Sequence, residues 1–167
     1  VNSINDINEN EWEFIKNYDT CGFNGTFHLN KVNIDFHILR AGSEDPKIED
    51  KSRLDDEIKY AQYLVKKVTN NIYYKKTTFL FSYGLSQHFP NLLIGYKMWN
   101  NKNSIFQFNT NKISFYPSKN IYYGLHHRIG TLIDAISFGY YMGYKEIILV
   151  GVDLYDNGYF WAEKNKT

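Results

Sequence analysis

A group of polar residues that could bind a ligand follows an apolar run near the end of the sequence. Residues 144–161 read YKEIILVGVDLYDNGYFW, and Asp153 and Tyr155 come directly after the apolar part. Asp153 can accept two hydrogen bonds from hydroxyl groups, Tyr155 can donate one to an anion, and Gly151 allows close approach to the backbone. Ligands of open parallel sheets bind outside the carboxyl ends of the strands, so these residues predict a binding site. The alternative is that DNG at residues 156–158 is a turn and Asp153 caps structure there.

A second candidate site lies upstream, at the expected start of a helix. Thr131 and Asp134 have the spacing of a capping box, which predicts that this helix begins near Gly130. Unsatisfied amide groups at that start, next to Arg128, would form an anion site on the same edge of the sheet. The alternative is that Thr131 is only a helix cap and Arg128 only a surface charge.

The sequence does not predict a metal site or a familiar catalytic motif. His126 and His127 are adjacent, so they point in different directions, and no further ligand lies at a suitable spacing. The single cysteine, Cys21, excludes an internal disulfide and a cysteine-based zinc site, and we expect it to be a small buried side chain. No P-loop, G-x-S-x-G, H-E-x-x-H or complete G-x-G-x-x-G sequence occurs.

Helix-like and strand-like segments alternate along the chain. Expected helices cover residues 7–17, 54–68, 85–99 (interrupted at Pro90) and 129–143, and expected strands cover residues 18–23, 34–39, 77–83, 105–109, 113–116 and 146–150, with a loop at residues 41–53. The alternation, and a last strand that is apolar on both faces, predict an α/β fold with a doubly wound, mostly parallel sheet and helices on both faces. In the second helix, Asp55, Asp56 and Glu57 lie in the expected first turn and Lys66 and Lys67 in the last, a distribution typical of a solvated helix.

Size and charge limit the classes of function. The 167 residues are 43% hydrophobic, which is enough for one domain spanning residues 1–167. The net charge of +1 provides no field that would attract a polyanion, so we expect no nucleic-acid partner. The sequence has neither the roughly 20 apolar residues of a membrane span nor a leader peptide, and we expect a soluble, cytoplasmic protein.

Residues 126–161, HHRIGTLIDAISFGYYMGYKEIILVGVDLYDNGYFW, carry a resemblance to a known family. From Arg128 to Trp161 the chain resembles bacterial sialyltransferases of glycosyltransferase family 42, which act in lipooligosaccharide biosynthesis, and more distantly the motility-associated flagellin glycosyltransferases. A weaker match covers NSINDI at residues 2–7 and YDTCGFN at residues 18–24. The resemblance implies a Rossmann-like glycosyltransferase domain without its first strand, incomplete at both ends.

The resemblance also implies a reaction and its site residues. The reaction is the inverting transfer of sialic acid from CMP-sialic acid to a galactose-type acceptor on a surface glycan, without a metal ion or other cofactor. Tyr155 would donate a hydrogen bond to the departing phosphate. The residues implied to line the nucleotide-sugar pocket are Asn24, Arg40, Arg128, Gly130, Thr131, Asp153 and Trp161.

Three departures from the family pattern leave alternatives open. Trp161 stands where the family has a second phosphate-binding tyrosine, although Tyr159 is nearby, and Arg40 replaces an asparagine. The glycine-rich loop would precede Val1, and the histidine that acts as general base would follow Thr167. The alternatives are a flagellin-type transferase for another CMP-activated nonulosonic acid and a truncated, non-catalytic nucleotide-binding remnant. Peripheral membrane association of a longer protein and a homo-oligomer are both compatible with the resemblance.

Overall fold

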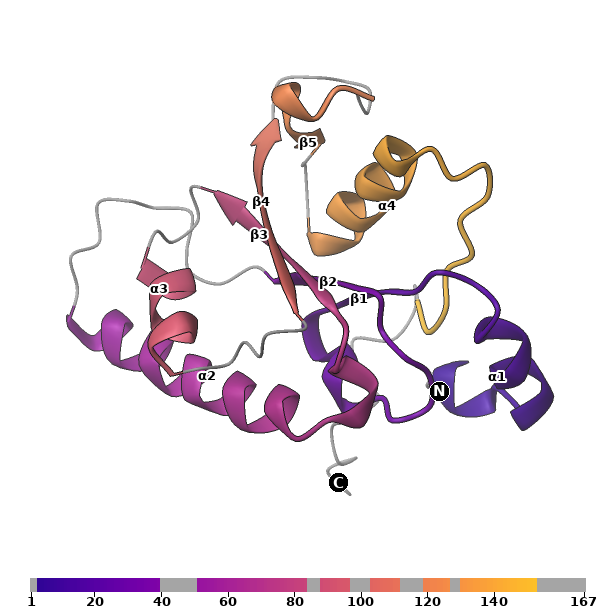
Figure 1. Cartoon of the computed structure of the whole chain (residues 1–167), viewed down its shortest axis with the longest axis horizontal. Helices are drawn as coiled ribbons and strands as arrows, with labels where there is room; N and C mark the ends of the chain where they lie inside the picture. Colours follow the sequence, from indigo (N-terminus) through magenta and orange to yellow (C-terminus); the bar gives the residue numbers. More distant parts are fainter. Residues whose placement is uncertain are drawn as a thin grey trace, which may run out of the picture.

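The computed structural model describes residues 3–39, 51–83, 88–96, 103–111, 119–126 and 130–152. Its centre is a five-stranded parallel sheet in which the strands follow one another in chain order (Figure 1). The strands are β1 (Cys21–Phe23), β2 (Phe36–Leu39), β3 (Thr78–Tyr83), β4 (Ser104–Asn111) and β5 (Leu125–His126). The longest pairing joins β3 to β4, whereas β5 pairs only with Thr110 and Asn111 at the end of β4.

Four α-helices and four short 3-10 helices accompany the sheet in the described part of the chain. The α-helices are α1 (Glu9–Ile15), α2 (Lys51–Thr69), α3 (His88–Gly95) and α4 (Thr131–Met142), and the 3-10 helices are η1 (Ser3–Asp6), η2 (Asn24–His28), η3 (Ile72–Tyr74) and η4 (Ile121–Tyr123). Asn8 caps the start of α1, because Asn8 and Glu11 form a capping box with bonds of 2.8 and 3.1 Å. None of the described helices is long and apolar enough to cross a bilayer.

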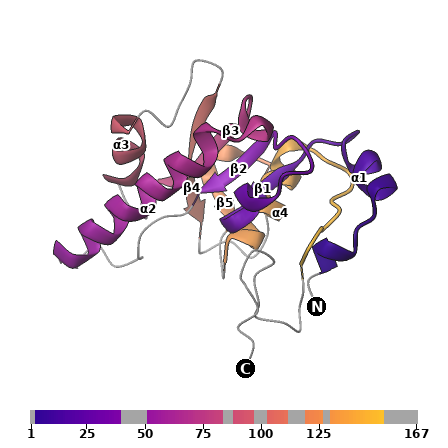
Figure 2. The same ribbon diagram turned by 90° about the horizontal axis from the view of Figure 1, so that it is seen from below.

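Helices cover both faces of the sheet. Successive side chains of a strand point to opposite faces, so Phe79 and Phe81 of β3 join the core beneath α2 and α3, whereas Leu80 faces Phe138 of α4. Figures 1 and 2 show α2 and α3 together on one side and α4 on the other. The α/β layering expected from the sequence is therefore present in the described part of the chain.

Several expected boundaries were wrong. Helix α2 begins at Lys51, within the expected loop at residues 41–53, which places Asp55 to Glu57 beyond its first turn; the rest of that expected loop lies outside the described residues. Pro90 does not interrupt α3 but lies in its first turn, where its missing N–H has no helical acceptor to lose. The sequence did not predict β5, and the expected strand at residues 113–116 lies outside the described residues.

The expected strand at residues 146–150 is the largest error. These residues are irregular, and Ile147, Ile148 and Leu149 are 42%, 56% and 50% exposed. A strand needs a neighbouring backbone for its hydrogen bonds, and no described strand pairs with this segment. Tyr144 attaches the segment to the start of β1, since its hydroxyl donates to the carboxylate of Asp19.

Cys21 is exposed, contrary to the buried position expected for it. It begins β1, which pairs with β2 on one side and has no described strand on the other. A side chain on an edge strand lacks the neighbours that would cover it in the middle of a sheet.

Candidate functional site

The carboxyl end of β1 places Asn24 at the edge of the sheet. Asn24 directly follows β1, is exposed, and has a φ of 50°. A turn holds this conformation, because the hydroxyl of Thr26 accepts a hydrogen bond from the Phe23 amide at 3.0 Å and donates one to the Phe23 carbonyl at 2.7 Å. Asparagine adopts positive φ values more readily than most residues, which suits it to this position.

Position 22 of β1, next to this turn, packs so closely against β2 and the turn that only glycine fits there. A Cβ atom on Gly22 would lie 2.9 Å from Nδ1 of His37 in β2 and 2.9 Å from Cγ2 of Thr26. The missing side chain at Gly22 therefore lets the Asn24 turn fold back against the sheet. No pattern in the sequence pointed to this role.

The start of α4 lies one residue away from the position that a capping box would give it. Gly130 is the N-cap, with a φ of 81°, and Thr131 is the first helical residue. The interpretation of Thr131 and Asp134 as a capping box is therefore wrong, because a box needs its threonine at the N-cap. The Thr131 hydroxyl is available for a different partner.

That partner is Asn24. The Thr131 hydroxyl donates a hydrogen bond of 3.3 Å to Oδ1 of Asn24, across a separation of 107 residues in the sequence. Thr131 is buried at 8% exposure, while Asn24 and Gly130 are exposed. The structure thus brings together Asn24, Gly130 and Thr131, three of the residues predicted to line one pocket.

The start of α4 at this junction has backbone hydrogen-bond donors without partners in the described part of the chain. Gly130 provides no side-chain cap, and the amide groups of Thr131 and Leu132 have no acceptor among the described residues. Gly130 is exposed, whereas Thr131 and Asp134 in the same turn are buried, so the Asp134 carboxylate does not stand at the surface of the helix start. The helix dipole adds a partial positive charge there, and the junction is suited to an anionic or polar group.

The other predicted site residues lie outside the described part of the chain. These residues are Arg40, Arg128, Asp153, Tyr155 and Trp161. Gly151 is described and has a φ of 68°, but a Cβ atom there would lie 3.0 Å from the side chain of Ile4, so η1 occupies the space beside it.

Two surface cavities lie elsewhere. One, of about 280 Å³, lies at the starts of β1 and β2, where Asp19, Thr20 and Asp35 line it; the other, of about 220 Å³, lies between η2 and the end of α2. Neither is lined by Asn24, Gly130 or Thr131. Within the described ranges, no group of His, Cys, Asp and Glu side chains is arranged to hold a metal ion.

Comparisons with known proteins add no assignment. No family model, no curated protein and no solved structure matches this chain. The functional interpretation therefore depends on the geometry of the Asn24–Thr131 junction and on the residues of the segment from Arg128 to Trp161.

Proposed function

We propose that this chain is a glycosyltransferase domain that binds a CMP-activated sugar, CMP-sialic acid, at the carboxyl edge of its sheet and transfers the sugar with inversion to a galactose-type acceptor. The observation that carries the proposal is the hydrogen bond between Thr131 and Asn24. These residues are separated by 107 positions in the sequence and were expected to share a nucleotide pocket. Their meeting beside a helix start without a side-chain cap supports a donor-binding site.

The path of the chain supports a doubly wound fold around this site. Helices α2 and α3 connect β2 to β3 and β3 to β4 and contact each other on one face. Helix α4 follows β5 but packs on the other face, where it contacts β1 and β2. From β1 to β5 the chain moves across the sheet in one direction, with its connecting α-helices on one face. Because parallel crossovers are right-handed, a connecting helix on the other face carries the chain in the opposite direction, towards the free edge of β1. The strand order would then reverse next to β1, which is where open sheets bind ligands.

The residues have distinct roles in this proposal. Asn24, Gly130 and Thr131 hold the nucleotide and donor sugar through an amide, a backbone and a hydroxyl group, together with Arg40, Arg128, Asp153 and Trp161. Tyr155 donates a hydrogen bond to the phosphate as it departs, and a neutral donor aimed at developing negative charge lowers the barrier without a metal ion. A general base removes the proton of the acceptor hydroxyl as its oxygen attacks the sugar.

Calorimetric titration with CMP tests the proposed site. We expect saturable binding of CMP that EDTA does not change, and weaker binding of UDP and AMP. Replacing Asn24 by glycine deletes the amide while the positive φ remains allowed. Asn24→Gly should weaken CMP binding by about 2- to 12-fold, the range for one hydrogen bond of about 0.5–1.5 kcal/mol.

Matched variants make the titration specific. Asn5→Gly changes an exposed asparagine in η1 and should leave the affinity for CMP unchanged. Arg128→Ala should weaken binding more than Tyr155→Phe, because a charged hydrogen bond contributes more than a neutral one. Equal CMP affinity in wild type, Asn24→Gly and Arg128→Ala would refute the proposed site, and transfer of a different CMP-activated nonulosonic acid would identify the flagellin-type alternative.

A further inference from the structure

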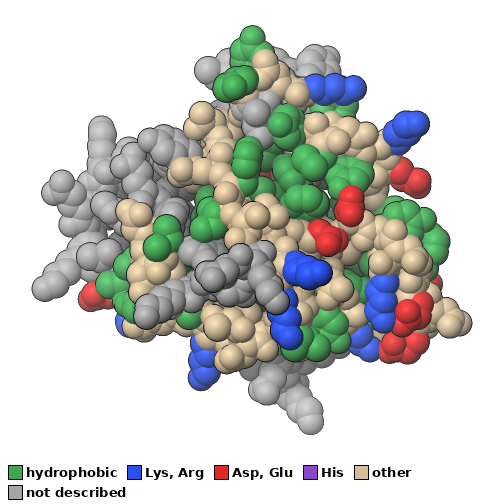
Figure 3. Space-filling view, in the orientation of Figure 1, with side chains coloured by type: hydrophobic (Ala, Val, Ile, Leu, Met, Phe, Trp, Pro, Cys, Tyr) green, Lys and Arg blue, Asp and Glu red, His purple; other side chains and the backbone are tan. Residues whose placement is uncertain are grey.

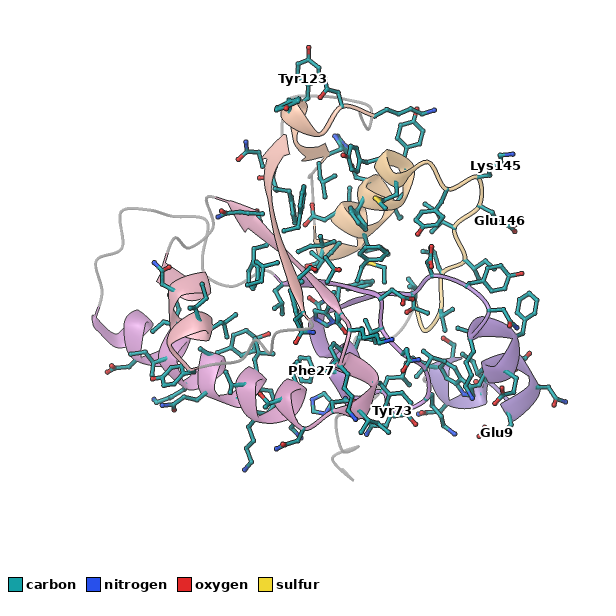
Figure 4. All side chains as sticks on the ribbon, viewed as in Figure 1. Glu9, Phe27, Tyr73, Tyr123, Lys145 and Glu146 are labelled. Carbon is teal, nitrogen blue, oxygen red and sulfur yellow. The ribbon has the colours of Figure 1, made fainter. Side chains whose placement is uncertain are left out.

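A second site is formed by the cavity of about 220 Å³ between η2 and the carboxyl end of α2. Phe27 contributes an aromatic wall and is buried, and Figure 4 shows it beside the last turns of α2. The other lining residues are polar or positively charged: His28, Asn30, Lys66, Lys67, Asn70 and Asn71. No carboxylate is among these lining residues.

The two lysines bring positive charge that the described residues do not neutralise. Neither Lys66 nor Lys67 forms an ion pair or a hydrogen bond within the described part of the chain, and the Lys67 ammonium lies 5.7 Å from the centre of the Tyr63 ring. The carboxyl end of α2 carries roughly half a negative charge from the helix dipole, which is less than the charge of the two ammonium groups. The cavity therefore keeps a net positive potential.

Hydrogen bonds hold the walls in place without a ligand. The Asn71 amide donates to the Phe27 carbonyl at 3.2 Å and to Oδ1 of Asn30 at 3.1 Å, and its oxygen accepts from the Tyr73 amide at 2.9 Å. These bonds join η2, the following turn and η3. Because Asn30 accepts through its oxygen, its own N–H groups remain as donors to a ligand.

Aromatic contacts fix the opposite wall. Nε2 of His28 lies 2.8 Å from the Tyr63 hydroxyl, and the Tyr63 ring meets the Phe27 ring edge-on with centroids 5.8 Å apart. Partial burial, and then the charge of Lys67, lower the pKa of His28. The positive charge of Lys67 therefore acts on the His28 imidazole, and the same charge would attract an anion into the cavity.

We propose that this cavity binds the phosphate group of a phosphorylated small molecule or lipid, independently of the glycosyltransferase site. Lys66 and Lys67 donate charge-assisted hydrogen bonds to the phosphate oxygens, and the Asn30 amide donates a neutral one. Phe27 excludes water from one side of the bound group. This differs from the interpretation of the sequence, in which the two lysines belong to the solvated face of a helix and form no site.

Titration of the full chain with inorganic phosphate tests the proposal. The double variant Lys66→Gln/Lys67→Gln should lower the affinity by about tenfold or more, because each charged hydrogen bond contributes strongly. The control Lys59→Gln/Lys76→Gln removes the same net charge from exposed positions outside the cavity and should change the affinity less than about twofold. No saturable binding by wild type, or equal losses in the two double variants, would overturn the proposal.

A second readout comes from His28. Among the described groups, the Tyr63 hydroxyl and the Lys67 ammonium of α2 face its imidazole, and the Phe27 ring of η2 lies beside it in a tilted arrangement with centroids 4.7 Å apart. A bound phosphate counteracts the charge of Lys67, so the pKa of His28, followed by NMR, should rise in saturating phosphate. In Lys66→Gln/Lys67→Gln, adding phosphate should not change the pKa of His28. A His28 pKa that does not respond to phosphate in the wild type would also overturn the proposal.

Two further probes distinguish the source of the phosphate and separate this site from the first one. Stronger binding of glucose 6-phosphate than of inorganic phosphate would identify a soluble ligand, and binding only to vesicles that contain phosphatidic acid would identify a lipid headgroup. Asn24→Gly should leave phosphate binding unchanged, and Lys66→Gln/Lys67→Gln should leave CMP binding unchanged. The experiments can therefore contradict the phosphate site without contradicting the CMP site, and the reverse.

Discussion

At the residue scale, His37 shows how the core changes the chemistry of a side chain. It lies in β2 at 1% exposure, with Nδ1 2.9 Å from the Tyr74 hydroxyl and aromatic rings of Phe27, Tyr74 and Phe79 around it. Its Nε2 has no hydrogen-bond partner among the described residues. Loss of hydration lowers the pKa of His37 to about 3, so the imidazole is neutral in the folded protein at pH 7.

Acid should therefore destabilise the protein through His37. In the unfolded chain its imidazole binds a proton near the ordinary pKa of 6.5, while the folded pKa is about 3, so stability is lost as pH falls between these values. The loss should reach about 1.4 kcal/mol per pH unit. Urea unfolding across this range should show a smaller slope with pH for His37→Gln, whose amide does not titrate and can still bond to Tyr74. Equal slopes in wild type and variant would contradict the assignment to His37.

At the element scale, α4 is defined by its two glycine ends. It begins after Gly130 and ends at Gly143, whose φ of 85° lets the chain reverse. The Gly143 amide bonds to the Tyr140 carbonyl and the Tyr144 amide to the Gly139 carbonyl, both at 3.1 Å, as in a Schellman motif. This end directs residues 144–150 back across the helix, where Ile147 meets Gly139.

Replacing Gly143 by alanine should weaken this end of α4. A Cβ atom at positive φ costs about 1–2 kcal/mol, and Gly143→Ala should lower the free energy of unfolding by that amount. Gly95→Ala is the matched control: Gly95 ends α3 without a positive φ, and a Cβ atom there meets nothing within 4 Å. The free energy of unfolding of Gly95→Ala should equal that of the wild type or be slightly higher. Equal destabilisation by both variants in urea titrations would argue against the role of the Gly143 conformation.

At the scale of the whole molecule, the faces of the sheet are covered but its edges are less protected. No described strand pairs with the outer edge of β1, and the first residues of β4 leave Ile105 and Phe106 at 45% and 41% exposure. Figure 3 shows hydrophobic side chains at the surface over α4, the helix that leads into the exposed residues Ile147 to Leu149. Open edges and apolar surface together favour association between molecules.

We expect the chain to self-associate with rising concentration through the segment after α4. Ile148→Lys should shift sedimentation towards the monomer, because a charge at a position 56% exposed in the monomer would be buried in the associated form. Ile72→Lys introduces the same charge at a position 61% exposed in η3 and should leave association unchanged. A wild-type protein that remains monomeric at all concentrations would refute this expectation.

Local sequence signals determined most elements of this protein. The spacing of apolar residues predicted α2 and α4, and the strand-like segments predicted β1 to β4 within a few residues. Asn8 caps the start of α1 and Gly143 the end of α4, both through bonds to nearby residues of the chain. These features depend on neighbours along the chain, which the sequence contains. The resemblance implied one pocket for Asn24, Gly130 and Thr131; the structure joins Thr131 to Asn24 by a hydrogen bond, and the pocket itself stays a prediction.

Tertiary structure decided what depends on distant neighbours. The apolar run at residues 146–150 has the composition of a strand, but pairing requires a second backbone, and none of the described strands provides it. Thr131 was expected to cap its own helix, but a partner 107 residues away competes for its hydroxyl. Lys66 and Lys67 have the sequence pattern of an ordinary helix end, and only the packing of η2 near them forms the surface cavity that they line. Hydrogen bonding and burial between remote segments are properties of the folded chain, and local spacing does not encode them.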